Sequence, residues 1–400
     1  MRILFLVDKF PVISETFVLN QITGLIDLGH DVEICARARG DTDKVHKDTL
    51  TYELLKKTFY LQKPKSFLQA AEGMILLLKN ILSKPFSVKK ILNRSISQKM
   101  SLSFRLVLLI KMTLSQPYDV VLCHFGPNGN WGLVLKDFGL VKKVATIFHG
   151  YDLSVIAKES GTRIYEDLFR RGDLFLPISD YWKKELIRLG CPPEKIKVHH
   201  MGIDVEMFNV NNQKETHSKN INLLSVGRFV QKKGFEFAIR AVAALIQQGH
   251  KICYQIVGSG PLEEDLKTLV KELHIEKQVD FLGMLNAQEI KQEFQQAHIF
   301  LLPSVTADNG DKEGIPVVLM EAMASGLAVV TTEHSGIPEL VKDRSSGFLV
   351  PERNVELIVE RLDQLICHPS QRIEMGDRGR DMFHIKKLNK RLETILIGEK

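Results

Sequence analysis

Two glutamates that flank the start of a predicted helix, Glu313 and Glu321, have the clearest potential for chemistry. Pro316 favours a helix that begins just after it, because a first turn has no use for a proline N–H. Glu313 then lies on the preceding loop, and Glu321 lies about one turn inside the helix. An anion can bind the first-turn amides that lack a partner within the helix, at Ile315, Val317 and Val318. A sugar nucleotide, with hydroxyls at both ends and phosphates between them, fits this arrangement. The plainer alternative is a helix start whose acids only complement the helix dipole.

A second group of candidates lies in the loop after the first predicted strand of the second half of the chain. Arg228 offers a planar fork and Lys233 a point charge, and both suit a diphosphate. Lys232 fits a solvated basic turn equally well. The loop is not a Walker A motif, because the order Gly-x-x-x-x-Gly-Lys-Ser/Thr is absent. Gly258–Pro261 forms a tight loop after another strand, but Glu263 interrupts the Gly-x-Gly-x-x-Gly fingerprint of a dinucleotide site.

The elements that position these residues belong to a chain of 400 residues, a length that suggests two domains. A content of 44% hydrophobic and 26% charged residues is typical of a soluble globular protein. Five scattered cysteines indicate a reducing cytoplasm rather than a zinc or disulfide framework. The apolar run at residues 3–7 is too short for a signal peptide and predicts a buried first strand. No apolar run approaches the length of a membrane span.

Short apolar strands alternate with helical stretches along most of the chain. In the first half we expect strands at Ile3–Val7, Asp31–Ala36, Asp119–Cys123, Val144–Phe148, Phe175–Ile178 and Lys195–His199. After a polar linker at 209–222, we expect further strands at Asn222–Val226, Cys253–Val257, Val279–Leu282, Ile299–Leu302, Ala328–Thr331 and Gly347–Val350. Such βαβ units predict two doubly wound, Rossmann-like α/β domains with a crevice between them. Ligands are expected at the carboxyl ends of the strands.

The segment from about residue 41 to 116 breaks this alternation and contains no convincing strand. Its apolar residues recur at helical spacing, at Phe67, Leu68, Ala71, Met74, Ile75, Leu78, Ile81 and Leu82. Between Lys56 and Lys111 there are twelve Lys and Arg and one acid, so this stretch carries +11 while the whole chain carries +6. The stripe alone suits a helix packed into the first domain. The uncompensated charge favours contact with an anionic membrane surface. Because the charge is confined to one segment, it does not indicate nucleic acid binding.

Taken together, Arg228 with Lys233, Gly258–Pro261, and Glu313 with Glu321 resemble the donor-site motifs of the family-four retaining glycosyltransferases with the GT-B fold. The likeness extends over nearly the whole chain. Further motifs resemble the colanic-acid-type branch, which builds exopolysaccharide, capsule or O-antigen repeat units: Phe10-Pro11, Ser14–Phe17, His124–Pro127, Phe148–Gly150 and Ser335–Leu340. Where many relatives carry a Gly-Gly pair in the first loop, this chain and that branch carry another sequence, here Pro11–Ser14.

The resemblance implies an acceptor-binding N-terminal domain over residues 1–203, with the basic helical insertion at about 41–116. It also implies a C-terminal domain over residues 204–400 that binds the nucleotide-sugar donor. The last helix could cross back to the N-terminal domain. The two domains would face each other across a central cleft.

The same resemblance implies roles at the donor site. Arg228 and Lys233 would neutralise the departing nucleoside diphosphate, so that neither a metal nor a cofactor is required. Glu321 would bind the ribose hydroxyls, and Glu313 would contact the donor sugar. The donor-binding set is Arg228, Lys233, Gly258, Gly260, Glu313, Gly314, Ile315, Pro316, Val317 and Glu321. Family frequency favours a UDP-sugar over a GDP-sugar as the donor.

In the other domain, His149 ends a strand and would lie beside the reacting sugar carbon, although a lone histidine is more often structural than catalytic. The implied catalytic residues are His149, Glu313, Arg228 and Lys233. The implied acceptor-binding residues are Ser14, Glu15, His124 and Asp152. Asp152 could instead only cap the helix that follows it.

The implied function is transfer of a hexose, with retention, from a nucleoside-diphosphate sugar to a lipid-linked oligosaccharide in bacterial exopolysaccharide, capsule or O-antigen biosynthesis. The enzyme would work in the cytoplasm, peripherally on the inner face of the plasma membrane. Two alternatives remain open, a sugar-nucleotide epimerase of the same fold and a non-catalytic sugar-nucleotide-binding subunit. An epimerase would not need the basic segment. The joint presence of the five donor-site and strand-end residues argues against a degenerate site: Arg228, Lys233, Glu313, Glu321 and His149. The sequence indicates neither the sugar nor the oligomeric state.

Overall fold

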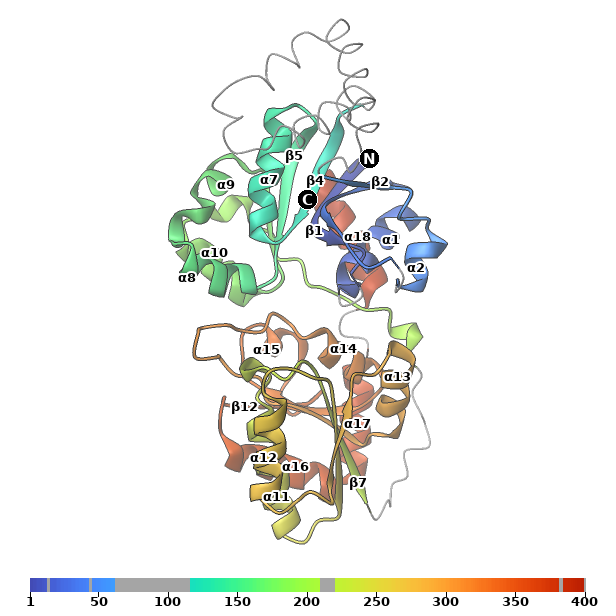
Figure 1. Ribbon diagram of the computed structural model, residues 1–400, viewed down its shortest axis with the longest axis vertical. Helices are drawn as coiled ribbons and strands as arrows, with labels where there is room; N and C mark the ends of the chain where they lie inside the picture. Colours follow the sequence, from blue (N-terminus) through green and yellow to red (C-terminus); the bar gives the residue numbers. More distant parts are fainter. Residues whose placement is uncertain (13–14, 43–44, 62–115, 209–219, 381–383, 399–400) are drawn as a thin grey trace, which may run out of the picture.

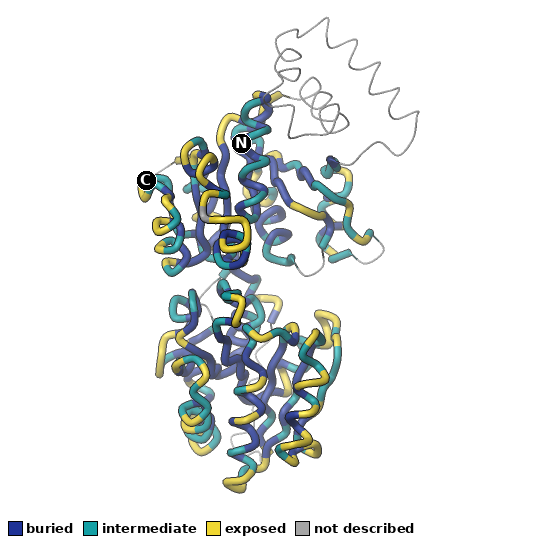
Figure 2. Tube along the Cα trace, turned by 60° about the vertical axis from the view of Figure 1, so that its left-hand side comes forward, coloured by how far each residue is buried: buried dark blue, intermediate teal, exposed yellow. Residues whose placement is uncertain are grey.

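The structure is a computed structural model that describes residues 1–12, 15–42, 45–61, 116–208, 220–380 and 384–398. It contains two α/β domains, one above the other in Figure 1, each built on a six-stranded sheet with helices packed against it. Most of the central strands are buried along most of their length (Figure 2), as is usual for parallel sheets covered on both faces. Among the described residues, no helix is long and apolar enough to cross a membrane.

The first domain contains a parallel sheet in the order β3-β2-β1-β4-β5-β6. Its strands are β1 (Arg2–Phe10), β2 (Asp31–Arg39), β3 (Thr58–Tyr60), β4 (Tyr118–His124), β5 (Val141–Phe148) and β6 (Leu174–Pro177). Its helices are α1 (Thr16–Asp27), α2 (Lys47–Thr51), α7 (Gly126–Asp137), α8 (Ala157–Glu159), α9 (Glu166–Arg171) and α10 (Asp180–Arg188). The strand order reverses between β1 and β4, so the loops after these strands diverge there and leave room for a ligand.

The second domain repeats this plan with the order β12-β11-β10-β7-β8-β9. Its strands are β7 (Ile221–Val226), β8 (Ile252–Val257), β9 (Val279–Gly283), β10 (Ile299–Leu302), β11 (Ala328–Thr332) and β12 (Phe348–Val350). Its helices are α11 (Phe235–Gln247), α12 (Glu263–Glu272), α13 (Ala287–Gln296), α14 (Val317–Ala324), α15 (Ile337–Leu340), α16 (Val355–Cys367) and α17 (Pro369–Gly379). The reversal between β7 and β10 is the corresponding place for a ligand.

The alternation predicted from the sequence is confirmed, but two segments differ. Strand β3 lies in the segment where the sequence predicts none; its three residues pair with Ile34–Ala36 of β2, too few to produce a periodic pattern. The predicted strand Lys195–His199 is wrong, because Pro193–Lys195 forms a 3-10 turn and a single bridge joins Ile196 to β6. The apolar stripe at 67–82 and most of the basic stretch lie outside the described residues.

The last helix, α18 (Ile385–Ile397), packs on the first domain, where Figure 1 shows it in red beside α1 in blue. His30 Nε2 lies 2.9 Å from Glu393 Oε1, and the Asn389 side chain donates to the Asn20 carbonyl at 3.1 Å. Gly24 of α1 leaves the room that Asn389 fills, because a Cβ on Gly24 would lie 1.7 Å from Asn389 Nδ2. The end of the chain therefore packs on the domain where the chain begins.

Glu339, in α15 of the second domain, reaches across to the first domain. Its carboxylate accepts hydrogen bonds from the amides of Asp180 at 3.0 Å and Tyr181 at 3.2 Å, and lies 2.8 Å from His200 Nε2. The two amides begin α10, where N–H groups lack intrahelical partners and a negative charge is favourable. Lys312 adds a hydrogen bond to the Tyr181 hydroxyl. The second domain thus supplies part of the N-terminal cap of a helix in the first domain.

Candidate functional site

The loops after β7 and β8 pack closely against each other through glycines. Gly258 has a φ of +137°, and a Cβ at this position would lie 2.0 Å from the Gly227 carbonyl oxygen. A Cβ on Gly260 would lie 2.6 Å from the carbonyl oxygen of Phe229. Side chains at either position would push the loops apart, so only glycine allows this approach. The two glycines thereby fix the loop that carries Arg228.

The two predicted phosphate-binding cations lie in different surroundings. Arg228 is exposed and forms no ion pair with another described residue. The side chain of Lys233 is only 13% exposed, and its Nζ lies 3.1 Å from Glu313 Oε1. Lys232 also has partners and does not form a solvated turn, since its Nζ lies 3.1 Å from Asp311 Oδ2 and 3.9 Å from Glu313 Oε1. The loop therefore presents one exposed cation and two that face acidic side chains.

Glu313 is buried and is fixed at both ends. Loss of solvent raises the pKa of its carboxyl, but the nearby Lys233 and Lys232 outweigh this effect, so the pKa is lowered overall. Its backbone amide donates a hydrogen bond to His334 Nε2 at 3.0 Å. Glu313 is therefore an ionised carboxylate at neutral pH, directed toward the cations of the β7 loop.

Helix α14 begins after Pro316, as the sequence predicts, and no side chain caps its N-terminus. Its first amides, beginning with that of Val317, lack an intrahelical partner and suit an anion. Glu321 lies one turn further along. Loss of solvent raises the pKa of its carboxyl to about 7, against an opposing effect of Lys291. Two glutamates that look alike in sequence therefore differ in charge, since Glu313 is ionised and Glu321 is about half protonated at pH 7.

Gly314 brings the loop of Glu313 against the first domain. A Cβ on Gly314 would lie 2.4 Å from Ile178 Cδ1 and 2.8 Å from the backbone carbonyl oxygen of His149. The next residue, Ile315, is buried within the same contact region. The predicted donor loop and the predicted catalytic histidine are therefore neighbours, although they come from different domains.

His149 lies in an aromatic cluster at the end of β5. Its Nε2 is 3.1 Å from His124 Nδ1, and its ring centroid is 4.8 Å from that of Phe17 and 4.4 Å from that of Phe125. Burial lowers the pKa of His149 to about 3, and burial, with His149 nearby, holds the pKa of His124 well below its ordinary value. Both imidazoles are neutral at pH 7. His149 can therefore accept or donate a hydrogen bond, but it holds no imidazolium proton to give to a leaving group.

Asp152 supports this cluster from behind. It is fully buried at the first residue of a π-helical turn, Asp152–Ile156, and its carboxylate accepts from the amides of Gly126 at 2.9 Å, His149 at 3.1 Å and Gly150 at 2.9 Å. Burial raises the pKa of Asp152 to about 6, against the opposing effect of these amides. Asp152 therefore ties together the loops after β4 and β5. Asp152 has no exposed surface in this structure, which favours the supporting role, and its contact with an acceptor stays a prediction.

The remaining acceptor-side predictions lie at the start of α1. Glu15 directly precedes α1 and makes no capping hydrogen bond with its side chain. Burial, with a smaller contribution from Asp8, raises the pKa of its carboxyl to about 6. Glu15 and Pro11 line a small cavity of about 10 Å³. Ser14 lies outside the described residues, so its predicted part in acceptor binding stays a prediction.

Comparison with known proteins identifies the family. A model named Glycosyltransferase Family 4 matches residues 14–207, and one named Glycosyl transferases group 1 matches residues 208–382. A putative colanic acid biosynthesis glycosyltransferase of Salmonella typhimurium is 40% identical and covers 99% of this chain and 99% of its own length. The chain is a family-four glycosyltransferase.

Other relatives of this glycosyltransferase agree. An amylovoran biosynthesis glycosyltransferase of Erwinia amylovora is 42% identical over 91% of this chain and 90% of its own length. HepE of Anabaena, crystallised with UDP and glucose, has a TM-score of 0.71 at 18% identity and covers all of both chains. The family and this likeness confirm the predicted GT-B fold. They do not favour the epimerase or the non-catalytic alternative.

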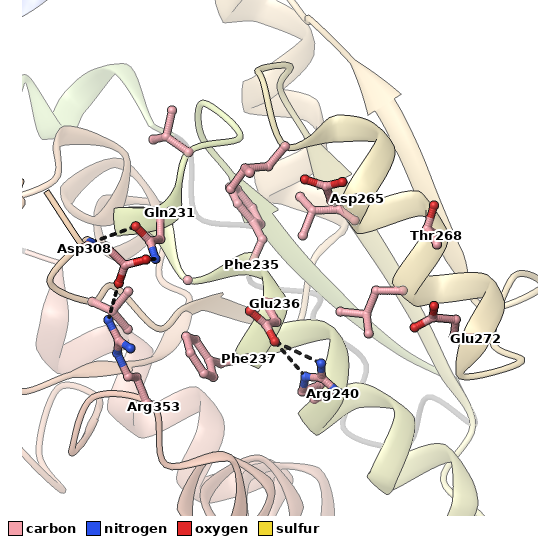
Figure 3. Close-up of a pocket in the computed structure, with 16 residues that line it drawn as sticks. Gln231, Phe235, Glu236, Phe237, Arg240, Asp265, Thr268, Glu272, Asp308 and Arg353 are labelled. Atoms are coloured by element: carbon pink, nitrogen blue, oxygen red, sulfur yellow. Dashed lines mark hydrogen bonds and ion pairs between the residues drawn. The ribbon is translucent and has the colours of Figure 1, made fainter.

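The glycosyltransferase also has a pocket of about 640 Å³ that the sequence does not predict, bordered by α11, α12 and Arg353 (Figure 3). Four of its charged residues form two pairs within the pocket, Arg240 with Glu236 at 2.9 Å and Arg353 with Asp308 at 3.7 Å. None of the predicted donor-binding residues lines it. We therefore place the candidate donor site at the strand ends rather than in this pocket.

Sequence reasoning also missed supporting residues of the glycosyltransferase site. His334 and Glu352 lie behind Glu313, and Glu339, for which the sequence predicts no separate role, joins the two domains. Their hydrogen-bond partners lie far away in the sequence, so no local spacing reveals them. A partial signal exists, because His334 directly precedes the motif Ser335–Leu340 that supports the family resemblance.

Proposed function

We propose that this glycosyltransferase transfers a hexose, with retention, from a nucleoside-diphosphate sugar to a lipid-linked glycan during bacterial exopolysaccharide biosynthesis. The names of two relatives support the pathway, since they are described as colanic acid and amylovoran biosynthesis enzymes and cover at least 90% of this chain. A UDP-sugar is the proposed donor, which the UDP and glucose bound by HepE support by analogy of fold.

The main observation in support of the proposal is that Lys233, Glu313 and His149 lie close together, although His149 belongs to the other domain. Lys233 and Glu313 form an ion pair at 3.1 Å, and the glycine after Glu313 touches the backbone of His149. A donor with its diphosphate at Lys233 would place its sugar near Glu313 and against the first domain. The reacting carbon would then face the domain proposed to bind the acceptor.

Charge stabilisation at this site is proposed to come from the protein itself. Arg228 and Lys233 would face the negative charge that develops on the departing diphosphate, and the first amides of α14 would add to it. The neutral His149 would contribute a hydrogen bond or its backbone carbonyl, not a proton. On this basis we propose that turnover does not require a metal ion.

Incubation of the purified protein with UDP-glucose, UDP-galactose, GDP-mannose and GDP-fucose, with and without EDTA, tests the proposal. We expect slow release of one nucleoside diphosphate without acceptor, faster release with a lipid-linked glycan, and no effect of EDTA. Proton NMR of the product should show the anomeric configuration of the donor. Arg240→Ala serves as a matched control, because Arg240 pairs with Glu236 on α11 and belongs to no predicted site.

Three results would contradict parts of this function. An isomerised nucleotide sugar would indicate an epimerase, and binding without release of nucleotide would indicate a non-catalytic subunit. A product with inverted configuration would remove the proposed retention while leaving the transferase activity intact.

A further inference from the structure

His334 lies behind the loop of Glu313 and makes two polar contacts. It is almost completely buried, at 1% exposure, between β11 and α15. Its Nε2 is 3.0 Å from the backbone nitrogen of Glu313, and its Nδ1 is 2.6 Å from Glu352 Oε1. The ring therefore joins the loop after β10 to the segment after β12.

The two contacts fix the tautomer of His334. A backbone amide can only donate, so Nε2 must be the unprotonated nitrogen that accepts. Nδ1 then carries the proton and donates it to the Glu352 carboxylate. This arrangement holds only for the neutral imidazole, since a protonated ring would direct a second N–H at the amide of Glu313.

Glu352 is itself firmly positioned. Its carboxylate accepts from the Thr306 amide at 2.8 Å and from the Thr306 hydroxyl at 3.2 Å. Burial raises the pKa of Glu352, but His334 and Thr306 outweigh burial, so the pKa is lowered and the group is a carboxylate. A chain of hydrogen bonds thus runs from Thr306 through Glu352 and His334 to the amide of Glu313.

We propose that His334 is a positioning residue for donor recognition, which fixes the Glu313 loop through the Glu313 amide and has its tautomer set by Glu352. The inference rests on the proposed donor site at Glu313. A carboxylate that must meet the hydroxyls of one sugar needs a fixed backbone, and partners of this kind orient the groups that touch a ligand. Loss of the acceptor at Nε2 would leave the Glu313 amide without a partner and loosen the loop.

The charges that face His334 from its surroundings are Glu352, Glu313 and Lys312. Burial and Lys312 disfavour the protonated ring, the two carboxylates favour it, and the net effect lowers the pKa of His334. The ring is therefore neutral at pH 7 and becomes protonated only below the ordinary histidine range. Donor affinity should fall as the pH is lowered through that protonation.

Two substitutions separate the two contacts. His334→Gln keeps an acceptor near the position of Nε2, and His334→Asn keeps a donor near the position of Nδ1. His250→Asn is the matched control, because His250 forms a 2.8 Å pair with Asp363 away from the site in the same domain. Calorimetry at pH 7.5 and at successive lower pH values would measure two affinities, one for the nucleotide sugar with the highest turnover in the four-donor panel and one for its nucleoside diphosphate alone.

We expect His334→Asn to weaken nucleotide-sugar binding at pH 7.5 about ten-fold, equivalent to about 1.4 kcal/mol, while the diphosphate alone changes less than two-fold. His334→Gln should bind the nucleotide sugar with nearly wild-type affinity at pH 7.5 and should not show the decline in affinity that the wild-type protein shows toward acidic pH. Equal losses for sugar nucleotide and diphosphate, or none, would overturn the inference. If His334→Asn does not fold, the pH profile of His334→Gln decides. Failure of the wild-type protein to bind or turn over any donor would instead overturn the proposed function.

Discussion

Arg228 and Lys233 are assigned the same task, but their surroundings predict different costs of removal. Arg228 is exposed and unpaired among the described residues, whereas Lys233 pairs with the buried Glu313 at 3.1 Å. Either alanine variant should lower turnover by about 10²-fold, the scale of losing one charge-stabilising donor. Only Lys233→Ala should also destabilise the fold, by up to the order of 3 kcal/mol, because it removes the closer of the two cations beside a buried carboxylate.

Steady-state kinetics and urea unfolding of both variants, beside Arg240→Ala, would measure this contrast. Unchanged turnover in either variant would remove that residue from the proposed diphosphate site. Equal stability of both variants would show that the pair with Lys233 is not what keeps Glu313 ionised.

Glu321 carries a different prediction, because the pKa of its carboxyl is about 7 when folded and 4.5 ordinarily. Between these values the folded chain binds more protons, so its stability falls as pH rises through this window. Glu321→Gln removes that cost and should stabilise the fold at pH 8 by up to about 3 kcal/mol. It should also raise the KM for the donor, since an amide replaces a carboxylate that would accept the ribose hydroxyls.

Thermal unfolding at pH 5 and pH 8, together with donor kinetics, tests both parts. Glu276→Gln is the matched control, because Glu276 is an exposed glutamate in a loop of the same domain. The quantity to compare is the difference in stability between Glu321→Gln and the wild type at each pH. If this difference is the same at pH 8 as at pH 5, the carboxyl of Glu321 ionises normally.

At the residue scale, sequence patterns indicate groups on loops and helix starts better than the groups that support them. The positions of Glu313 and Arg228 on loops are predictable, because a nearby glycine, proline or strand end marks each of them. The family resemblance implies acceptor binding by Asp152, and the sequence leaves helix capping open as the alternative. Its actual partners include the amide of Gly126, 26 residues earlier, and a contact at that separation depends on the folded sheet.

At the scale of elements, the close approach of the α14 loop to the first domain rests on a single glycine. A Cβ on Gly314 would lie 2.8 Å from the His149 carbonyl oxygen and 2.4 Å from Ile178 Cδ1. Gly314→Ala should therefore displace the loop and lower turnover at least ten-fold, the effect expected when reacting groups are misplaced by about 1 Å. Binding of the nucleoside diphosphate alone should fall less than turnover, because its proposed cations Arg228 and Lys233 belong to the β7 loop.

Kinetics and calorimetry would test Gly314→Ala. Gly139→Ala would show the cost of backbone strain alone, because the φ of Gly139 is +75° and a Cβ there meets nothing within 4 Å. Wild-type turnover in Gly314→Ala would mean that the two domains do not need this contact during the reaction.

The helices and strands are predictable where short apolar runs alternate with helical stretches. A strand of a parallel sheet that is buried on both faces consists almost entirely of apolar residues, so it is recognisable in the sequence. Strand β3 was missed since three residues are too few for a pattern. Lys195–His199 was mistaken for a strand because its apolar and polar residues alternate, although only one bridge forms at Ile196. An element can thus be predicted only if its apolar pattern extends over enough residues.

At the scale of the whole molecule, the two domains are connected by more than the chain between them. Glu339 of the second domain caps α10 of the first, and α18 ends the chain on the domain where it begins. Both features are contacts between segments that lie far apart in the sequence. The family resemblance therefore predicts that the last helix crosses to the first domain, but the sequence does not indicate where it packs. The site between the domains depends on these contacts for its shape.

Most of the basic stretch from Lys56 to Lys111 lies outside the described residues. Its charge of +11 and the proposed lipid-linked acceptor lead us to propose that it docks the enzyme on an anionic membrane. Each Lys or Arg near such a surface contributes about 1 kcal/mol. Replacing Lys84, Lys89, Lys90 and Arg94 by Gln should therefore weaken vesicle binding by up to about 4 kcal/mol and leave donor hydrolysis intact.

Co-sedimentation with vesicles containing anionic or only neutral lipids would measure this binding over a range of salt concentrations. Binding should decline as salt rises, because screening at 0.1 M acts over about 10 Å. A control variant with Gln at four exposed lysines of the second domain, Lys251, Lys271, Lys277 and Lys342, removes equal charge elsewhere. Equal binding to neutral and anionic vesicles, or an equal loss of vesicle binding in both variants, would contradict membrane docking by this stretch. The stretch would then be a solvated insertion of the first domain.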